Sequence, residues 1–338
     1  MPLLRRIVMA TMVIVPFMCV AQEQPLHLVQ TIAMPNVKGR IDHMDVDLRT
    51  SRLFVAGLDN GSVEVLDLKA GKWLRTIPGF KKPQGILYLQ SLNKLFVASG
   101  DDGMVRVFRG DTLQPLADIH LKPGPNRLIF NPHTREVYVG YGGKDAGEVY
   151  GEVGVIDSTK YQVITNIKVA AHPAELLLQQ SGQRLYVLVP GATQIQVVDT
   201  NTRQVTSTWP TSSGRPGDGA LDELRHRVFV GTRKPAQLLV LDSDSGNEVV
   251  ALPTIDGMDG IYFNSKQKRI YVSGSSASDS SVWVYQQQDP GKYALIAKVP
   301  TREGAATALW VPELNRYYIA APTSGGTDAA VLVFEPEK

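Results

Sequence analysis

A short strand-like pattern recurs seven times along this chain and constrains its fold more than any other feature. Each copy has an apolar residue, an aromatic residue, a β-branched residue and then a small or apolar residue. The aromatic anchors are separated by 42, 42, 48, 43, 42 and 47 residues: they are Phe54, Phe96, Tyr138, Tyr186, Phe229, Tyr271 and Tyr318. Self-similarity at such a period indicates a repeat architecture.

Each anchor lies among other short segments of strand character. A run rich in β-branched residues follows every anchor, as in VEVLDL after Phe54 and IQVVDT after Tyr186, and such runs are typical of strands. A third run ends most units, and a short apolar run such as ILYL precedes the anchor. Four strands in every ~42 residues is the spacing of β-propeller blades.

The seventh unit lacks its last strand, because the chain ends at Lys338 soon after VLVFEP. Residues 26–35, LHLVQTIAMP, have the character of the missing strand and precede the first unit. An open ring would leave two unpaired strand edges, which promote aggregation. We therefore predict an all-β fold over residues 26–338. It is a seven-bladed β-propeller with four-stranded antiparallel blades, the last of which is closed by the N-terminal strand.

The first 21 residues have the pattern of a secretory signal peptide. Arg5 and Arg6 precede an apolar run over residues 7–21, and small residues before Gln22 suit cleavage near Ala21. The run is shorter than the ~20 residues of a membrane-spanning helix. We predict a signal peptide over residues 1–21 and a short linker over residues 22–25. The mature protein is then periplasmic or secreted and has no membrane span.

Cysteine content and charge exclude several functions for the mature chain. Cys19 is the only cysteine, so cleavage near Ala21 leaves no disulfide, thiolate ligand, cysteine nucleophile or c-type haem attachment. Loss of Arg5 and Arg6 lowers Lys+Arg from 35 to 33, which equals the 33 Asp+Glu. Nucleic-acid binding depends on a basic surplus, so this balance argues against a nucleic-acid partner.

The repeat resembles the YVTN-repeat β-propellers, the YncE-like periplasmic proteins. The likeness rests on QIQVVDTNTRQVTSTW (194–209) and on the RLYV-type anchors, and it covers essentially the whole mature chain. No anchor here is followed by the Thr-Asn that names the repeat. The resemblance implies a periplasmic propeller, and it also implies single-stranded nucleic-acid binding. Wider relatives include lactonases, streptogramin lyase and propeller subunits of redox enzymes, so the fold alone does not decide the function.

One segment has the composition of a calcium loop. DSDSGNE (242–248) contains Asp242, Asp244 and Glu248, but an EF-hand needs twelve residues and two flanking helices. Because the segment aligns with VVDTNTRQV in another repeat, we interpret it as a turn between two outer strands.

The candidate site begins with GRIDHMDVD (39–47), in which His43 lies eleven residues before Phe54. The positions eleven and twelve before each anchor begin the innermost strand of each blade, at the mouth of the central channel. They are polar in six of seven blades and differ from blade to blade, whereas structural repetition predicts sameness. A ligand site and a merely solvated mouth both explain this variety. The predicted ligand-binding residues are Arg40, Asp42, His43, Gln84, Arg127, Glu175, Asp218 and Asp259.

Two functions are open at this site. The first is a monomeric, non-catalytic binding or interaction propeller that needs no cofactor and takes an unknown small molecule or protein partner. The alternative is a lactonase-like hydrolase or a lyase. In that enzyme His43 is the general base, Glu175, Asp218 or Asp259 orients it or binds a metal, and Arg127 stabilises an anion. Carboxylates of this kind suit a divalent cation such as Ca²⁺ or Mg²⁺, but we assign no metal ligands.

Overall fold

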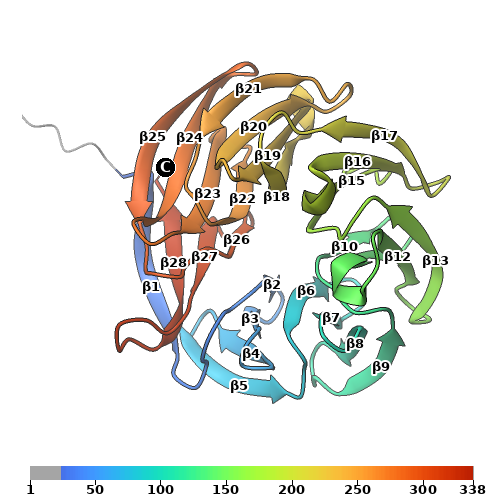
Figure 1. The fold of residues 1–338 in the computed structure, drawn as a ribbon. Coiled ribbons are helices and arrows are strands. Elements are labelled where there is room, and N and C mark those ends of the chain that lie inside the picture. Colours follow the sequence, from blue (N-terminus) through green and yellow to red (C-terminus); the bar gives the residue numbers. More distant parts are fainter. Residues whose placement is uncertain (1–23, 338) are drawn as a thin grey trace, which may run out of the picture.

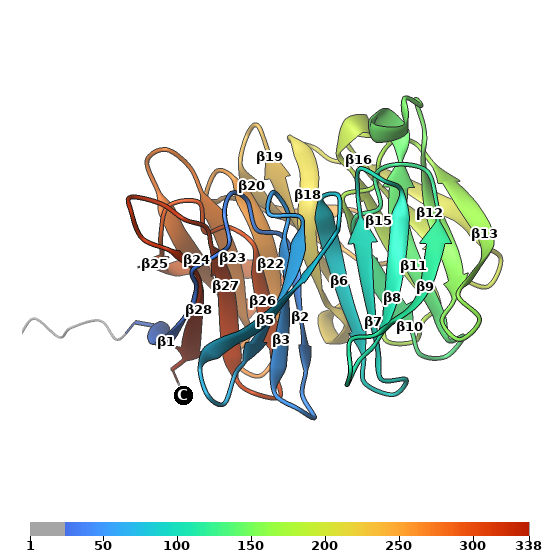
Figure 2. The same ribbon diagram turned by 90° about the horizontal axis from the view of Figure 1, so that it is seen from below.

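The computed structural model describes residues 24–337, and the predicted signal peptide lies outside the described residues. Within residues 24–337 the chain forms seven four-stranded antiparallel sheets, arranged as blades around a central axis (Figure 1). The ring is a disc when it is seen from the side (Figure 2). The predicted all-β, seven-bladed propeller is therefore confirmed.

The first six blades each take four consecutive strands, and the first strand of each is innermost. Blade 1 contains β2 (Met44–Asp47), β3 (Arg52–Gly57), β4 (Ser62–Asp67) and β5 (Lys72–Pro78). Blade 2 contains β6 (Pro83–Leu89), β7 (Lys94–Ser99), β8 (Met104–Arg109) and β9 (Pro115–His120). Blade 3 contains β10 (Leu128–Asn131), β11 (Glu136–Gly142), β12 (Gly151–Asp157) and β13 (Gln162–Val169). Blade 4 contains β14 (Glu175–Leu178), β15 (Arg184–Val189), β16 (Gln194–Asp199) and β17 (Gln204–Pro210).

The remaining blades complete the ring. Blade 5 contains β18 (Arg215–Asp222), β19 (Arg227–Arg233), β20 (Gln237–Asp242) and β21 (Glu248–Pro253). Blade 6 contains β22 (Met258–Asn264), β23 (Arg269–Ser275), β24 (Ser280–Asp289) and β25 (Lys292–Pro300). Blade 7 contains β26 (Ala308–Val311), β27 (Arg316–Ala321), β28 (Ala329–Pro336) and the N-terminal β1 (Leu26–Met34). Three short 3₁₀ segments lie in connections: η1 (Gly143–Ala146), η2 (Pro190–Ala192) and η3 (Glu223–Arg225). Among the described residues no helix has the length and hydropathy to cross a membrane.

Blade 7 is closed by the first strand of the chain, as predicted. Strand β1 pairs antiparallel with β28 from Leu26, opposite Pro336, to Met34, opposite Ala329. Ile32 and Met34 are fully buried in the core between blades 7 and 1. The pairing covers the β28 edge that an open ring would expose, and it joins the two ends of the propeller.

The anchors fix the same register in every blade. Each pairs with the residue nine positions earlier on the innermost strand, from Asp45 opposite Phe54 to Leu309 opposite Tyr318. The anchors themselves are buried and pack between blades. For example, the ring of Phe54 stacks on Tyr88 of the next blade at a centroid distance of 5.5 Å. Residues counted back from the anchors therefore reach equivalent heights along the channel.

Three innermost strands are irregular where they begin, at the channel mouth. The register shifts between Pro83 and Ile86 in β6, between Pro216 and Asp218 in β18, and between Met258 and Gly260 in β22. A β-bulge re-aims the side chains beside it. These shifts therefore decide where the mouth residues of blades 2, 5 and 6 point.

The aspartate-rich segment at 242–248 forms a turn between β20 and β21, as expected. Asp242 Oδ1 accepts hydrogen bonds from the backbone N–H groups of Asp244 and Ser245. Asp157 and Asp199 cap the equivalent turns of blades 3 and 4 in the same way. The repeated aspartate is thus a turn-forming residue, whose carboxylate holds the local backbone.

Candidate functional site at the channel mouth

A cavity of about 90 Å³ lies at the mouth of the channel. Side chains from blades 1, 3, 4, 5 and 6 line it, although they are far apart in sequence. Six of the eight predicted residues are among them: Arg40, Asp42, His43, Glu175, Asp218 and Asp259. The ring therefore brings most of the predicted set to one place.

Arg127 lies beside the cavity and connects three blades. Its Nε donates to Glu175 Oε1 at 2.8 Å, and its terminal nitrogen Nη1 lies 3.0 Å from His43 Nδ1. The Glu175 side chain is 2% exposed and the His43 side chain 11% exposed. Arg127 thus holds a buried carboxylate of blade 4 and an imidazole of blade 1 in fixed positions.

The contact with Arg127 determines the tautomer of His43. A guanidinium can only donate hydrogen bonds, so Nδ1 of His43 must accept and carries no proton. The proton of the neutral ring is on Nε2, which lies 3.5 Å from Asp42 Oδ1. Burial and the nearby charge of Arg127 lower the pKa of His43 to about 3. His43 is therefore neutral at physiological pH.

Asp42 and Asp259 face each other in unlike surroundings. Burial, together with the charge of Asp259, raises the pKa of Asp42 to about 7, although Arg40 acts in the opposite direction. Burial also acts to raise the pKa of Asp259, but Arg233 at 2.7 Å and Arg40 at 3.4 Å outweigh it and lower that pKa. Asp259 is thus a firmly ionised carboxylate, whereas Asp42 changes its charge near neutral pH.

Glu175 and Asp218 form a close pair of buried carboxyl groups. Burial raises the pKa of both groups, and the charge of Glu175 raises that of Asp218 well above its usual range. Hydrogen bonding from Asp218 in turn lowers the pKa of Glu175. Two adjacent carboxyl groups that cannot both ionise share a proton, so this pair holds a proton at a higher pH than an isolated carboxyl group would. Backbone N–H groups of Leu176 and Gly219 orient the pair.

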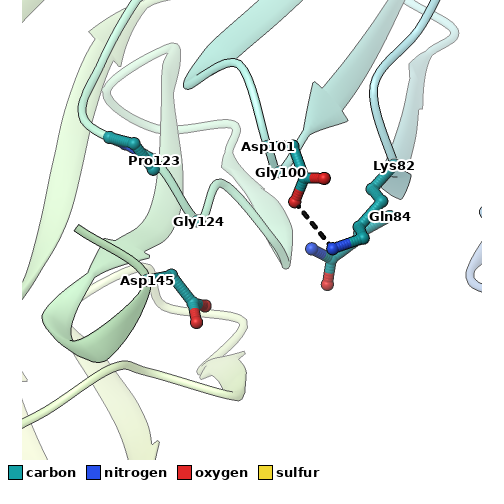
Figure 3. Close-up of a pocket in the computed structure, with 7 residues that line it drawn as sticks. All are labelled: Lys82, Gln84, Gly100, Asp101, Pro123, Gly124 and Asp145. Carbon is teal, nitrogen blue, oxygen red and sulfur yellow. Dashed lines mark ion pairs between the residues drawn. The ribbon is translucent and has the colours of Figure 1, made fainter. Parts of the chain in front are cut away.

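Gln84 does not line this cavity. It lines a separate cavity of about 260 Å³ between blades 2 and 3, together with the Lys82–Asp101 ion pair at 2.9 Å and Asp145 of η1 (Figure 3). The register shift at the start of β6, between Pro83 and Ile86, includes Gly85, whose missing side chain lets the Asn126 carbonyl approach closely. Blade 2 therefore contributes no side chain to the polar cavity.

Besides Asn126, which lines the cavity, the predicted set leaves out two side chains that contact the site. Arg233 ends β19 and binds both Asp259 and the carbonyl oxygen of Met258. Thr307 of blade 7 donates to Asp259 Oδ2 at 3.0 Å. Arg233 could have been found by comparing the residues four positions after each anchor. Other blades have Leu58, Gly100 and Pro190 at that position, so a charged residue there is exceptional among these blades.

The channel below Arg127 is mainly apolar. A cavity of about 280 Å³ there is lined by innermost-strand residues such as Ile129, Leu177, Ala220 and Tyr262, with Arg127 itself at one side. The Tyr262 hydroxyl donates to the Ala308 carbonyl at 2.8 Å.

If the alternative enzyme used a divalent metal ion, several side-chain ligands would have to converge on one point. Among the described residues, no group of three or more histidine, aspartate or glutamate side chains is arranged to hold a metal ion. Six to eight oxygen ligands usually surround Ca²⁺.

Comparisons with known proteins identify the fold. No family model and no curated protein sequence match the chain. It is similar to the solved structure of Kuenenia stuttgartiensis hydrazine synthase, with 16% identity and a TM-score of 0.71, over 95% of this chain and 98% of that chain. It is also similar to a chain of the mitotic checkpoint complex, with 12% identity and a TM-score of 0.76, over 99% of this chain and 100% of that one. These likenesses define the chain as a seven-bladed β-propeller.

Proposed function

We propose that this protein is a non-catalytic binding propeller that takes a small polar ligand into the cavity at the channel mouth. One observation carries the proposal: five blades direct side chains of both charges into one cavity of about 90 Å³, where Arg127 fixes Glu175 and His43. Concave sites with a few convergent polar groups are typical of ligand binding.

The state of His43 favours binding over base catalysis. Its Nδ1 lone pair is occupied by Arg127, and its pKa is lowered to about 3. An effective general base has a pKa near the operating pH, so this imidazole is a poor proton acceptor at neutral pH. It serves better as a rigid, neutral part of the cavity wall.

The experiment is a ligand screen by thermal denaturation and calorimetry, with Arg127→Met as the site variant. We expect a small polar compound to raise the melting temperature of the wild type, because a ligand that binds only the folded state stabilises it. The variant should lose this response. The control is Arg184→Met, which removes an exposed ion pair with Asp244 on the opposite rim. A compound that both variants bind equally well would place binding elsewhere.

The Glu175–Asp218 pair favours a second candidate, a hydrolase or lyase. Glu175 and Asp218 are adjacent buried carboxyl groups whose pKa values are both raised, and such a pair can donate and accept a proton in turn. Assays with lactone substrates test this candidate. Turnover that disappears in Asp218→Asn, while ligand binding persists, would replace the binding function with catalysis.

The repeat pattern and the N-terminal segment support two finer assignments. We infer that the chain is a YVTN-repeat, YncE-like propeller, because QIQVVDTNTRQVTSTW (194–209) and the RLYV-type anchors resemble that repeat, although no anchor is followed by its Thr-Asn. We further infer export to the periplasm or the medium, with cleavage near Ala21. Mass spectrometry of the protein from its native host should find an N-terminus at Gln22, and an intact Met1 would refute export by cleavage.

A further inference from the structure

A second cavity, of about 460 Å³, lies among the connections of blades 3, 4 and 5 and shares no lining residue with the cavity at the channel mouth. Sites for small molecules typically have volumes of ~300–1,000 Å³. We call it the insert cavity. Its wall includes Lys144, Glu148, Val149, Ala171, Pro190 and Arg215.

One wall of the insert cavity comes from an extended connection in blade 3. Strand β11 ends at Gly142 and β12 begins at Gly151, whereas the equivalent connection of blade 2 runs only from Ser99 to Met104. A blade therefore forms without this extension. Val149 in the extension is 92% exposed although its side chain is aliphatic, so it can contact the apolar part of a bound molecule.

The insert cavity carries two cations without partners. Among the described residues, the exposed side chains of Lys144 and Arg215 make no ion pair or hydrogen bond. The carboxylate in the wall, Glu148, is already bound by Lys122, whose Nζ donates to both of its oxygens at 3.0 Å. Asp145 follows Lys144 in the chain but lines the neighbouring cavity (Figure 3). The wall is therefore positively charged.

The other charges near the insert cavity do not reverse this sign. Lys122 also lies 3.0 Å from Glu152, and Lys168, opposite Glu152 in the sheet, supplies a further cation. Asp145 lies 3.4 Å from His172. Even with Asp145 counted, the two cations of the wall leave a positive surplus.

An independent observation in blade 5 also indicates an anion beside Arg215. Arg215 begins β18 directly opposite Arg233 of β19, and like charges at directly opposite positions of an antiparallel pair are destabilising. Arg233 has its own carboxylate, Asp259, at 2.7 Å. Arg215 has none among the described residues, so an anion bound there would relieve the repulsion.

We infer that the insert cavity binds a small carboxylic acid with a compact apolar body. The guanidinium of Arg215 can donate two parallel N–H bonds to a carboxylate, and Lys144 adds a second positive charge. Val149, Ala171 and Pro190 offer apolar surface to the rest of the ligand. This site does not depend on the function proposed for the channel mouth.

The test is calorimetric titration of the purified protein at about pH 7.5 with sodium 3-phenylpropanoate. The comparison compounds, at equal ionic strength, are 3-phenylpropanamide, which lacks the charge, propanoate, which lacks the ring, and inorganic phosphate. We expect 3-phenylpropanoate to bind at one site per chain and at least about tenfold more tightly than each comparison compound.

Variants locate the binding site. Arg215→Gln and Lys144→Gln should each weaken binding of 3-phenylpropanoate about tenfold, and Val149→Ser should weaken it about threefold. Two control variants should bind it as the wild type does. Lys160→Gln removes an exposed lysine beyond the other end of β12, and Arg40→Gln removes an exposed cation from the channel mouth. All five side chains are exposed, and melting curves check that each variant is folded.

Several results would overturn this inference. Phosphate or propanoate that binds as tightly as 3-phenylpropanoate would show charge attraction alone, and equally tight 3-phenylpropanamide would show that no carboxylate is needed. Binding that is lost in Arg40→Gln but kept in Arg215→Gln would move the ligand to the channel mouth, which would support the function proposed there. Failure of 3-phenylpropanoate to bind the wild type would remove the insert cavity as a carboxylate site and leave the proposed function untouched.

Discussion

Arg127 of blade 3 and Glu175 of blade 4 form a buried ion pair, with 2.8 Å between Nε and Oε1. The same guanidinium also contacts His43 of blade 1. Arg127 therefore links blade 1 to blades 3 and 4, although blade 1 is adjacent to neither, whereas each hydrophobic cluster joins only adjacent blades.

Arg127→Met should destabilise the protein by about 3–5 kcal/mol, because it leaves the Glu175 carboxylate buried without its cation. Urea unfolding at neutral pH measures the loss. The double variant Arg127→Met with Glu175→Met should recover most of it, since no charge is then buried alone. The matched control, Arg184→Met, removes an exposed pair and should cost less than about 1 kcal/mol. Equal losses in the two single variants would contradict the bridging role.

His43 should make the protein less stable as the pH falls. Its pKa in the folded state is lowered to about 3 from an ordinary 6.5, so its contribution is fully present above about pH 6.5 and is lost as the pH falls toward about 3. The groups that face it are Arg127, Asp42, Asp259 and Arg40.

Urea unfolding between about pH 7 and pH 4 measures the effect of His43. Each pH unit below the ordinary pKa should cost up to about 1.4 kcal/mol from this residue. His43→Gln should be less stable than the wild type at about pH 7 but should lack this part of the slope. Nitrogen NMR should show the Nε2–H tautomer at about pH 5, and a protonated ring at that pH would refute the assignment.

Closure of the ring by β1 predicts a sharp contrast between two neighbouring side chains. Ile32 is fully buried between blades 7 and 1, whereas Val29 on the same strand is 48% exposed. Ile32→Ala should cost about 2–5 kcal/mol through lost packing and the cavity it leaves. Val29→Ala should stay within about 0.5 kcal/mol of the wild type. Similar losses in the two variants, measured by urea unfolding, would show that β1 does not seal the propeller.

Gly85 should tolerate no side chain. A Cβ atom there would clash with the backbone carbonyl of Asn126, so Gly85→Ala forces apart blades 2 and 3 beside the cavity. We expect a loss of about 1–3 kcal/mol and weaker ligand binding. In the control, Gly291→Ala, the nearest atom to the new Cβ is 3.7 Å away, and stability should change by less than about 0.5 kcal/mol. A stable Gly85→Ala variant with normal binding would refute the close approach.

Much of the site could be predicted from the spacing of the anchors. Because each anchor pairs with the residue nine positions earlier, counting back eleven residues places His43, Arg127 and Glu175 at one height in three blades. The same repeat predicted the number of blades and the closing strand. These features depend on periodicity, which a single sequence displays directly.

The parts that could not be predicted depend on local irregularity. Gln84 has the expected position in the chain, yet the register shift in β6 and the small Gly85 leave it in a neighbouring cavity. Arg233 reaches Asp259 from the second strand of its blade rather than the first. Pairing of Glu175 with Asp218 depends on side-chain direction after the bulge in β18, and strand spacing does not encode that direction.

A high-resolution crystal structure of the purified protein tests the central claim most directly. The account predicts seven blades, with Arg127 within hydrogen-bonding distance of both His43 and Glu175 at the channel mouth. A different number of blades, or mouth side chains that turn away from one another into bulk solvent with no ligand between them, would contradict it.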